Sequence, residues 1–158
     1  MATFTSPRAA VNFPVFQSHA AGILCRAFGT IVIAANPTAA QTYAFCKVPE
    51  GAVVTGGWIM GPDLDTNGTE TLNMDIGWAA NRDEAGDPDG FGNLGVLTGD
   101  AVTGYKPAVG ILIPLQGVLL TAGPKTFTAE TTIQMVANVT AATGGTGTLT
   151  VLVDYIVP

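Results

Sequence analysis

The chain has 158 residues, of which 12 are acidic and 6 are basic, so its formal net charge is −6. The basic residues are scattered singly and cannot neutralise a row of phosphates, so nucleic acid is not an expected partner. Only 11% of the residues are charged and 47% are hydrophobic, whereas an average soluble domain has about 25% charged residues. A surface so poor in charge predicts a protein that lies against other proteins in an assembly, the alternative being a neutral, hydroxyl-rich surface.

Neither a signal peptide nor a membrane span is expected. The first residues, MATFTSPRAAVNFPVF, contain one positive residue, Arg8, and their apolar positions are interrupted by Asn12 and Pro14. The most apolar stretch, residues 108–120, is too short for a membrane helix and contains Pro114.

Residues 1–20 show neither helical nor strand periodicity and are predicted to form an extended N-terminal arm. Residues 21–158 are predicted to form one domain, because runs rich in Val, Ile, Thr and aromatics alternate with Gly, Pro, Asn and Asp clusters. The expected strands are residues 23–34, 42–48, 52–61, 70–79, 108–115, 117–121, 125–139 and 148–157. Short strands with one long polar loop at 81–93 favour an all-β, antiparallel β-sandwich of the jelly-roll type.

Apolar and polar side chains alternate along several of these strands, and this pattern predicts which face of each strand is buried. The residues predicted to face the core are Leu72, Met74, Ile76, Trp78, Phe127, Ala129, Ile133, Met135, Ala137, Val139, Leu149, Val151, Val153 and Tyr155. By contrast, residues 52–60 and 109–115 are apolar on both faces. This pattern predicts strands whose outer side is covered by another layer or another subunit.

Candidate contacts with a protein partner come from these two runs, from the arm and from the aromatic residues. They are Phe13, Phe16, Val54, Trp58, Met60, Phe91, Ile111 and Ile113. A different use of aromatics is a flat platform for a sugar, which Trp58, Trp78, Phe91 and Tyr105 would build. Trp78 occupies one of the alternating positions of its strand that are predicted to face the core, so core packing is the expected role for that residue.

Residues 63–68, DLDTNG, match the first half of a calcium-binding EF-hand loop, with Asp63, Asp65 and Asn67 as the oxygen ligands. The second half does not match, because the twelfth loop position, where a bidentate acid is needed, is Met74. The favoured interpretation is a turn in which Asp and Asn side chains hydrogen-bond their own backbone. The cation site remains the weaker alternative.

The sequence does not contain a convincing catalytic centre or cofactor site. His19 is the single histidine, and it lies beside Ser18 in the arm, where adjacent side chains point to opposite sides. Residues 90–95, GFGNLG, spell a dinucleotide motif without the strand and helix that give it meaning. A second acidic group is expected to be a solvated loop, with a calcium site as the alternative, and consists of Asp83, Glu84, Asp87 and Asp89. We therefore expect no enzyme and no cofactor.

Cys25 and Cys46 are predicted to be reduced core residues. If their segments formed a hairpin turning near residue 38, the two would lie roughly 20 Å apart along the ladder. A disulfide requires Cα atoms within about 7 Å. Another strand topology would change this spacing.

Three stretches of the chain resemble small structural proteins of tailed bacteriophages. They are FCKVPEGAVVTGGWIM (45–60), DLDTNGTETLNMDIG (63–77) and TFTAETTIQMVANVTAATGGTGTLTVLVDY (126–155). The chain is similar in particular to capsid decoration (cement) proteins with a jelly-roll β-sandwich core, over most of residues 24–156. The shared features are a Pro-x-Gly turn, a Val-rich strand, an Asp-x-Asp turn and a strand ending in Asp-x-Gly, here Pro49, Gly51, Val53, Val54, Asp63, Asp65, Asp75 and Gly77.

The resemblance implies a structural protein without catalytic residues. It implies an oligomer, commonly a trimer, that binds the outer surface of the assembled capsid and stabilises it by bridging neighbouring major capsid proteins. The chain would be made in the host cytoplasm, and its arm would lie along the capsid or a neighbouring subunit. The alternatives are another virion component, such as a tail or head-to-tail protein, and a carbohydrate-binding β-sandwich module.

Overall fold

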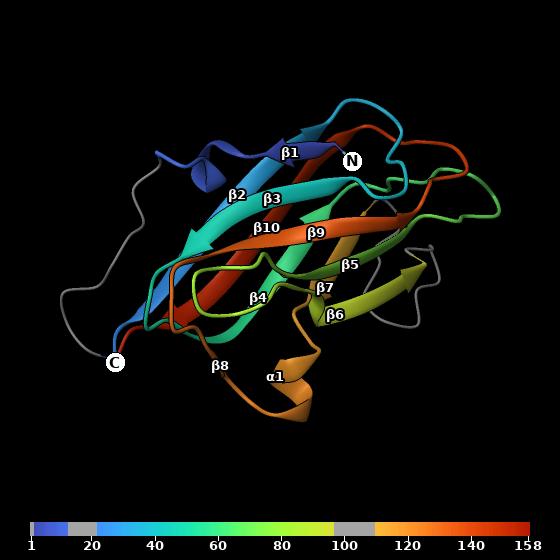
Figure 1. Cartoon of the computed structure of the whole chain (residues 1–158). Helices are drawn as coiled ribbons and strands as arrows, with labels where there is room; N and C mark the ends of the chain where they lie inside the picture. Colours follow the sequence, from blue (N-terminus) through green and yellow to red (C-terminus); the bar gives the residue numbers. More distant parts are fainter. Residues whose placement is uncertain (1, 13–21, 97–109) are drawn as a thin grey trace.

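The structure, a computed structural model, describes residues 2–12, 22–96 and 110–158. In this part of the chain the strands form two sheets that pack face to face, with β3, β9 and β5 crossing in front of β2, β10 and β4 in Figure 1. The strands are β1 (Thr3–Thr5), β2 (Leu24–Ile33), β3 (Thr42–Val48), β4 (Val53–Gly61), β5 (Asn73–Trp78), β6 (Asp87–Val96), β7 (Ile111–Pro114), β8 (Lys125–Thr126), β9 (Thr131–Val139) and β10 (Gly147–Ile156). The predicted all-β sandwich is confirmed.

Successive strands cross from one sheet to the other, except that β5 and β6 form a hairpin in one sheet and β7 and β8 both pair with β4 in the other. One sheet has the order β1-β3-β9-β5-β6 and the other β2-β10-β4-β7, with β8 beside β4. This crossing order is the one expected of a jelly roll, in which two Greek keys interlock. The pairs are antiparallel apart from β1, which runs parallel to β3.

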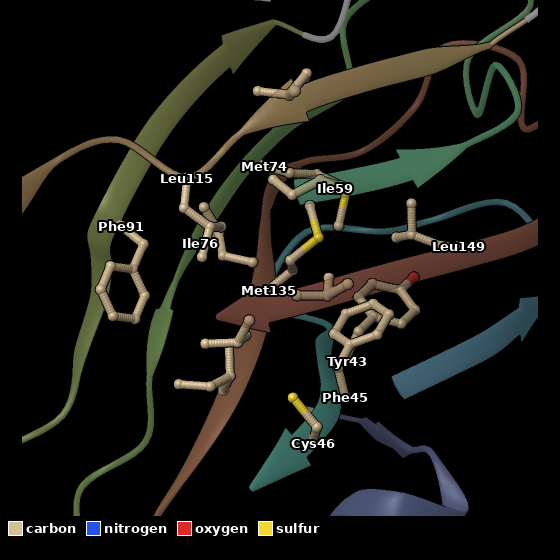
Figure 2. Packing of buried hydrophobic residues seen from close by; sticks show 14 of the residues in the cluster. Tyr43, Phe45, Cys46, Ile59, Met74, Ile76, Phe91, Leu115, Met135 and Leu149 are labelled. Carbon is tan, nitrogen blue, oxygen red and sulfur yellow. The ribbon is translucent and has the colours of Figure 1, made fainter. Parts of the chain in front are cut away.

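Side chains that alternate along the strands fill the space between the sheets. Ile76 and Met135 from one sheet meet Ile59 and Leu149 from the other in Figure 2, and all four are fully buried. The inward positions predicted from the sequence are confirmed as buried, with the exception of Val139, which is 45% exposed. Val139 is the last residue of β9 and lies where the strand leaves the sandwich.

Two predicted elements are wrong. The polar loop predicted at 81–93 is largely strand β6, which pairs with β5 through a ladder interrupted by bulges. The strand predicted at 117–121 is instead the short helix α1 (Val118–Thr121), in which the amide N of Ala122 donates to Val118 O. A run of four or five apolar residues does not distinguish a strand from a helical turn by its pattern alone.

One other sequence expectation changes only in extent. The long strand expected at 125–139 is divided into β8 and β9. Within the described residues, no helix has the length and apolar character needed to cross a membrane.

The first half of the predicted arm lies on the sandwich. Strand β1 pairs with β3, and the ring of Phe4 stacks on that of Tyr43 with centroids 5.3 Å apart. A 3-10 turn, η1 (Pro7–Ala9), follows. The Ser6 hydroxyl, which is buried, donates to the carbonyl oxygen of Phe45. Residues 13–20 of the arm lie outside the described part of the chain.

The hairpin considered for the two cysteines is wrong. Strand β2, which carries Cys25, pairs with β10, while β3, which carries Cys46, pairs with β9 in the opposite sheet. Both cysteines are buried and free. Burial raises the pKa of Cys46 to about 12, with a small opposing effect of Arg8, so its thiol stays protonated at neutral pH.

Candidate protein-docking surface

The outer face of the β2-β10-β4-β7 sheet carries a row of apolar side chains that crosses every strand. Leu152 of β10 lies opposite Phe28 of β2 on one side and Trp58 of β4 on the other, and Trp58 lies opposite Pro114 of β7. Side chains at directly opposite positions on one face of a sheet touch their neighbours. The row is therefore one continuous apolar strip.

Further apolar side chains extend this strip in both directions along the strands. We call the whole set the apolar sheet face, consisting of Leu24, Phe28, Val32, Trp58, Met60, Leu112 and Leu152. Its most exposed members are Val32 at 68% and Leu24 at 63%, while Trp58 is 40% exposed. The face is therefore open to solvent in the single chain, and its apolar area is available to a protein partner.

The charged and polar groups among these residues are paired with one another. The guanidinium of Arg26 donates to both carboxylate oxygens of Asp154, at 2.6 and 2.9 Å. The hydroxyls of Thr30 and Thr150 lie 3.2 Å apart and share a hydrogen bond. The Arg26–Asp154 pair thus adds no net charge to the apolar sheet face, and the Arg8 guanidinium lies over the ring of Phe28, with its carbon 3.9 Å from the centroid.

A β-bulge decides which side chains of β4 face outward. Asp154 pairs with Gly56 and the next residue, Tyr155, with Val54, so Thr55 is an extra residue in the ladder. Val54 is consequently fully buried, while Trp58, four positions later, is on the outer face. Without the bulge the two side chains would share a face, because residues an even number apart point the same way along a regular strand.

The predicted interface residues therefore fall into different places. Trp58 is exposed on the apolar sheet face, and Met60 lies beside it, half-buried. Four others are inside the core, where no partner of the folded chain can reach them, and these are Val54, Phe91, Ile111 and Ile113. Phe13 and Phe16 lie outside the described residues. Sequence reasoning missed Phe28, Val32 and Leu152, although the alternation along β2 and β10 carries their signal.

The aromatic residues considered for a sugar platform do not come together on the surface. Trp78 and Phe91 pack edge to face in the core, with ring centroids 5.0 Å apart, and both contact Phe127. Trp58 is on the outer face of the other sheet, and Tyr105 lies outside the described residues. Of the four residues considered, Trp78 and Phe91 therefore belong to the core, and Trp58 is on the surface.

The DLDTNG stretch forms a turn built on Asp65, which is completely buried. One carboxylate oxygen of Asp65 accepts from the backbone N–H groups of Thr71, Leu72 and Ala142 at 2.7 to 3.0 Å. The other accepts from Thr143 N at 3.0 Å. Burial raises the pKa of Asp65, but these four N–H groups outweigh it and hold the pKa well below its usual range.

The other two candidate metal ligands are also used by the turn. Asp63 accepts from the backbone N–H of Asp65 at 3.0 Å, and Asn67 accepts from that of Thr69 at 2.8 Å. Over residues 2–12, 22–96 and 110–158, no group of three or more His, Cys, Asp or Glu side chains is placed to hold a metal ion. A cation at Asp65 would have to displace backbone donors, so the turn interpretation fits this geometry.

The second acidic group is divided by the fold. Asp83 pairs with Arg82, and Glu84 accepts from Lys125 Nζ at 2.6 Å. Asp87 and Asp89 lie instead on β6, where Asp87 pairs with Trp78 of β5.

No protein family and no curated protein sequence matches the chain. Its fold is similar to chains in solved capsid structures. A chain in the capsid of Ralstonia phage GP4 superposes with a TM-score of 0.75 and 19% identity, over 99% of this chain and 99% of that one. A chain in the cyanophage Pam1 capsid asymmetric unit gives 0.67 and 24%, over 92% and 93%. One in the acidic stable capsid of Helicobacter pylori bacteriophage KHP30 gives 0.58 and 16%, over 88% and 91%.

Proposed function

We propose that the chain is a structural virion protein that binds the outer surface of an assembled phage capsid and stabilises it by bridging neighbouring major capsid proteins. The observation that carries the proposal is the apolar sheet face, a charge-poor surface on a chain in which 11% of the residues are charged. The similarity of its fold, over nearly its whole length, to chains of phage capsids supports the same conclusion.

The apolar sheet face supplies the contact energy in this proposal. Burying apolar surface is worth about 25 cal/mol per Å², and a specific interface covers about 800 Å² on each partner. Trp58 is the expected anchor, because large aromatic side chains near the centre of an interface contribute most to binding. The occupant that we propose for this face is the major capsid protein.

In this proposal the capsid shell is stabilised by mass action, and no catalysis is needed. A protein that binds the assembled shell and not its dissociated subunits shifts the equilibrium toward the shell. Many equivalent copies make individually modest contacts effective, and a trimer, which the resemblance implies, adds avidity of its own.

The proposal is tested with capsid shells assembled without this chain. We expect the added chain to bind saturably, in a fixed ratio to the capsid protein, and to raise the temperature at which the shells dissociate. Trp58→Asp should weaken binding at least tenfold, because it places a charge in an apolar contact.

A matched control is Leu120→Asp, which introduces the same charge at a residue that is 75% exposed on α1, the helix that contacts β6 of the other sheet. This variant should bind like the unmodified chain. Shells that take up none of the unmodified chain would contradict the capsid proposal. Saturable binding to tails, to head-to-tail assemblies or to sugars would instead support one of the alternative functions.

A further inference from the structure

Among the strands that the structure describes, β2 has a long sheet edge that nothing in its sequence protects from further pairing. Strands β1, β7 and β8 have at most four residues each, and β6 contains Pro88 and pairs through bulges. Strand β2 has ten residues, pairs with β10 without a register shift and contains neither proline nor lysine. Proteins usually protect a free edge with a short strand, a proline, a bulge or a lysine, so β2 is open to pairing with a further strand.

The main-chain groups of Thr30 and Val32 point toward this free edge. In an antiparallel sheet, residues that bond one neighbouring strand alternate with residues that bond the other. The amide N of Leu115 donates to Gly57 O where β7 meets β4, so the next residue of β4, Trp58, bonds β10 instead. Followed across β10, the alternation leaves the N–H and C=O groups of Thr30 and Val32 directed away from β10. Both residues therefore offer a donor and an acceptor to a strand beside them.

Beside Thr30 and Val32 the surface is hollowed into a groove between β2 and the N-terminal arm. An open cavity of about 590 Å³ is lined by residues 30–32 on one side and by residues 3–7 on the other. A second cavity, of about 240 Å³, adjoins the first, because Phe4 and Val32 line both. Figure 1 shows β1 beside the end of β2 at this edge of the sandwich. The groove therefore has two walls, β2 and the arm.

The groove is mainly apolar. The smaller cavity is lined by the apolar side chains of Phe4, Val32, Ile33, Ala34, Ala35 and Tyr43. Its polar residues are Asn36 and Gln41, and neither cavity is lined by a charged residue. A charge placed in such a groove would lose its water without gaining a partner, so an occupant with uncharged side chains fits it.

The two walls decide the form of the occupant. A segment that pairs with Thr30 and Val32 lies between β2 and the arm, so it is a single extended strand. The edge of a second copy would instead bring that copy's other sheet against β1. Extended segments bind sheet edges in this way, because main-chain bonds give affinity and pockets for alternate side chains give specificity.

We propose that this groove binds an extended, uncharged segment of the major capsid protein, which adds a short strand beside β2. Val32 belongs both to the groove and to the apolar sheet face, so the two surfaces are continuous and one partner covers both. This inference rests on the proposed function and adds the form and the chemistry of the capsid segment that is bound.

The first test is residue-resolved amide hydrogen exchange of the free chain and of the chain bound to capsid shells. In the free chain, the amides of Thr30 and Val32 should exchange faster than that of Ile31, which bonds β10. On the shells, exchange at Thr30 and Val32 should slow at least about tenfold, because their N–H groups then have acceptors.

Protection of these two amides in the free chain would overturn the proposal. If that protection increases with the concentration of the chain, the occupant is a second copy, and if it does not, the occupant is a segment of the same chain. Exchange at Thr30 and Val32 that is equally fast in the free and the shell-bound chain would overturn it as well.

The second test compares the binding of variants to the same shells. Thr30→Pro removes an edge N–H group and leaves the bonds to β10 intact, so it should weaken binding about fivefold. The control is Thr30→Val, which keeps this N–H group and removes only the hydroxyl that shares a hydrogen bond with Thr150. It should bind within about twofold of the unmodified chain. Ala35→Trp fills the smaller cavity and should weaken binding at least about tenfold.

Unchanged binding by Ala35→Trp would overturn this inference even if Thr30→Pro fails to fold. It would leave the proposed function intact, because Trp58→Asp tests the apolar sheet face separately. Failure of the unmodified chain to bind the shells would count against the proposed function itself.

Discussion

The carboxylate of Asp65 is predicted to be the most important single polar group for stability. Asp65→Ala leaves four backbone N–H groups, those of Thr71, Leu72, Ala142 and Thr143, without the carboxylate that accepts from them, and the bond from Leu72 is fully buried. Each unsatisfied donor costs about 1–3 kcal/mol, and water entering the space of the lost carboxyl group can serve some of them. If two remain unserved, the free energy of unfolding falls by about 4 kcal/mol, which lowers Tm by about 8–16 °C in a domain of this size.

Urea unfolding followed by circular dichroism measures this loss. The control is Asp83→Ala, which removes an exposed ion pair and should cost less than about 1 kcal/mol. A loss at Asp65→Ala no larger than in this control would show that the turn does not depend on its buried carboxylate.

The buried carboxylate of Asp65 also leads to a prediction about how the stability of the chain depends on pH. The folded chain holds the pKa of Asp65 below its usual range, and the unfolded value is about 3.9. The stabilisation is therefore complete above about pH 5 and is lost progressively as the pH falls through the unfolded pKa toward the folded pKa. The difference in unfolding free energy between the unmodified chain and Asp65→Ala should narrow from pH 7 to pH 3, and a constant difference would refute this assignment.

Two further predictions concern the core. Gly29→Ala would place a Cβ atom 1.8 Å from the carbonyl oxygen of Phe45, so we expect the free energy of unfolding to fall by at least about 3 kcal/mol or the chain to fail to fold. The control is Gly68→Ala, which has open space around it and should change the free energy of unfolding by less than about 1 kcal/mol. Equal urea midpoints for the two variants would contradict the close packing of β2 on β3. Because both cysteines are buried, and burial raises the pKa of Cys46 to about 12, neither thiol should react with a thiol reagent in the native chain at pH 7, although both should react in urea. Rapid reaction of the folded protein would contradict their burial.

The strands in which apolar and polar residues alternate were predictable from the sequence. Met74, Ile76 and Trp78 alternate along β5, Leu72 directly precedes this strand, and all four are buried. Strand β6 was not predictable in the same way, because its sequence, DPDGFGNLGV, is rich in residues that usually mark loops. Its pairing with β5 depends on bulges and on the close approach at Gly77, and both are tertiary features.

The docking surface was predicted only in part. The apolar character of both faces of residues 52–60 correctly indicated a strand with an apolar outer face, but not which residues face outward. The extra residue Thr55 reverses the alternation, so Val54 is in the core while Trp58 is outside. The composition of a strand does not reveal a bulge that depends on the partner strand, here β10.

The most direct test of the account is a cryo-electron microscopy map of particles that carry this chain. The account predicts that the chain occupies equivalent sites on the outer capsid surface, with Phe28, Trp58 and Leu152 packed against the major capsid protein. A map in which these three side chains face solvent at every site, or in which the chain is absent from the capsid lattice, would contradict it.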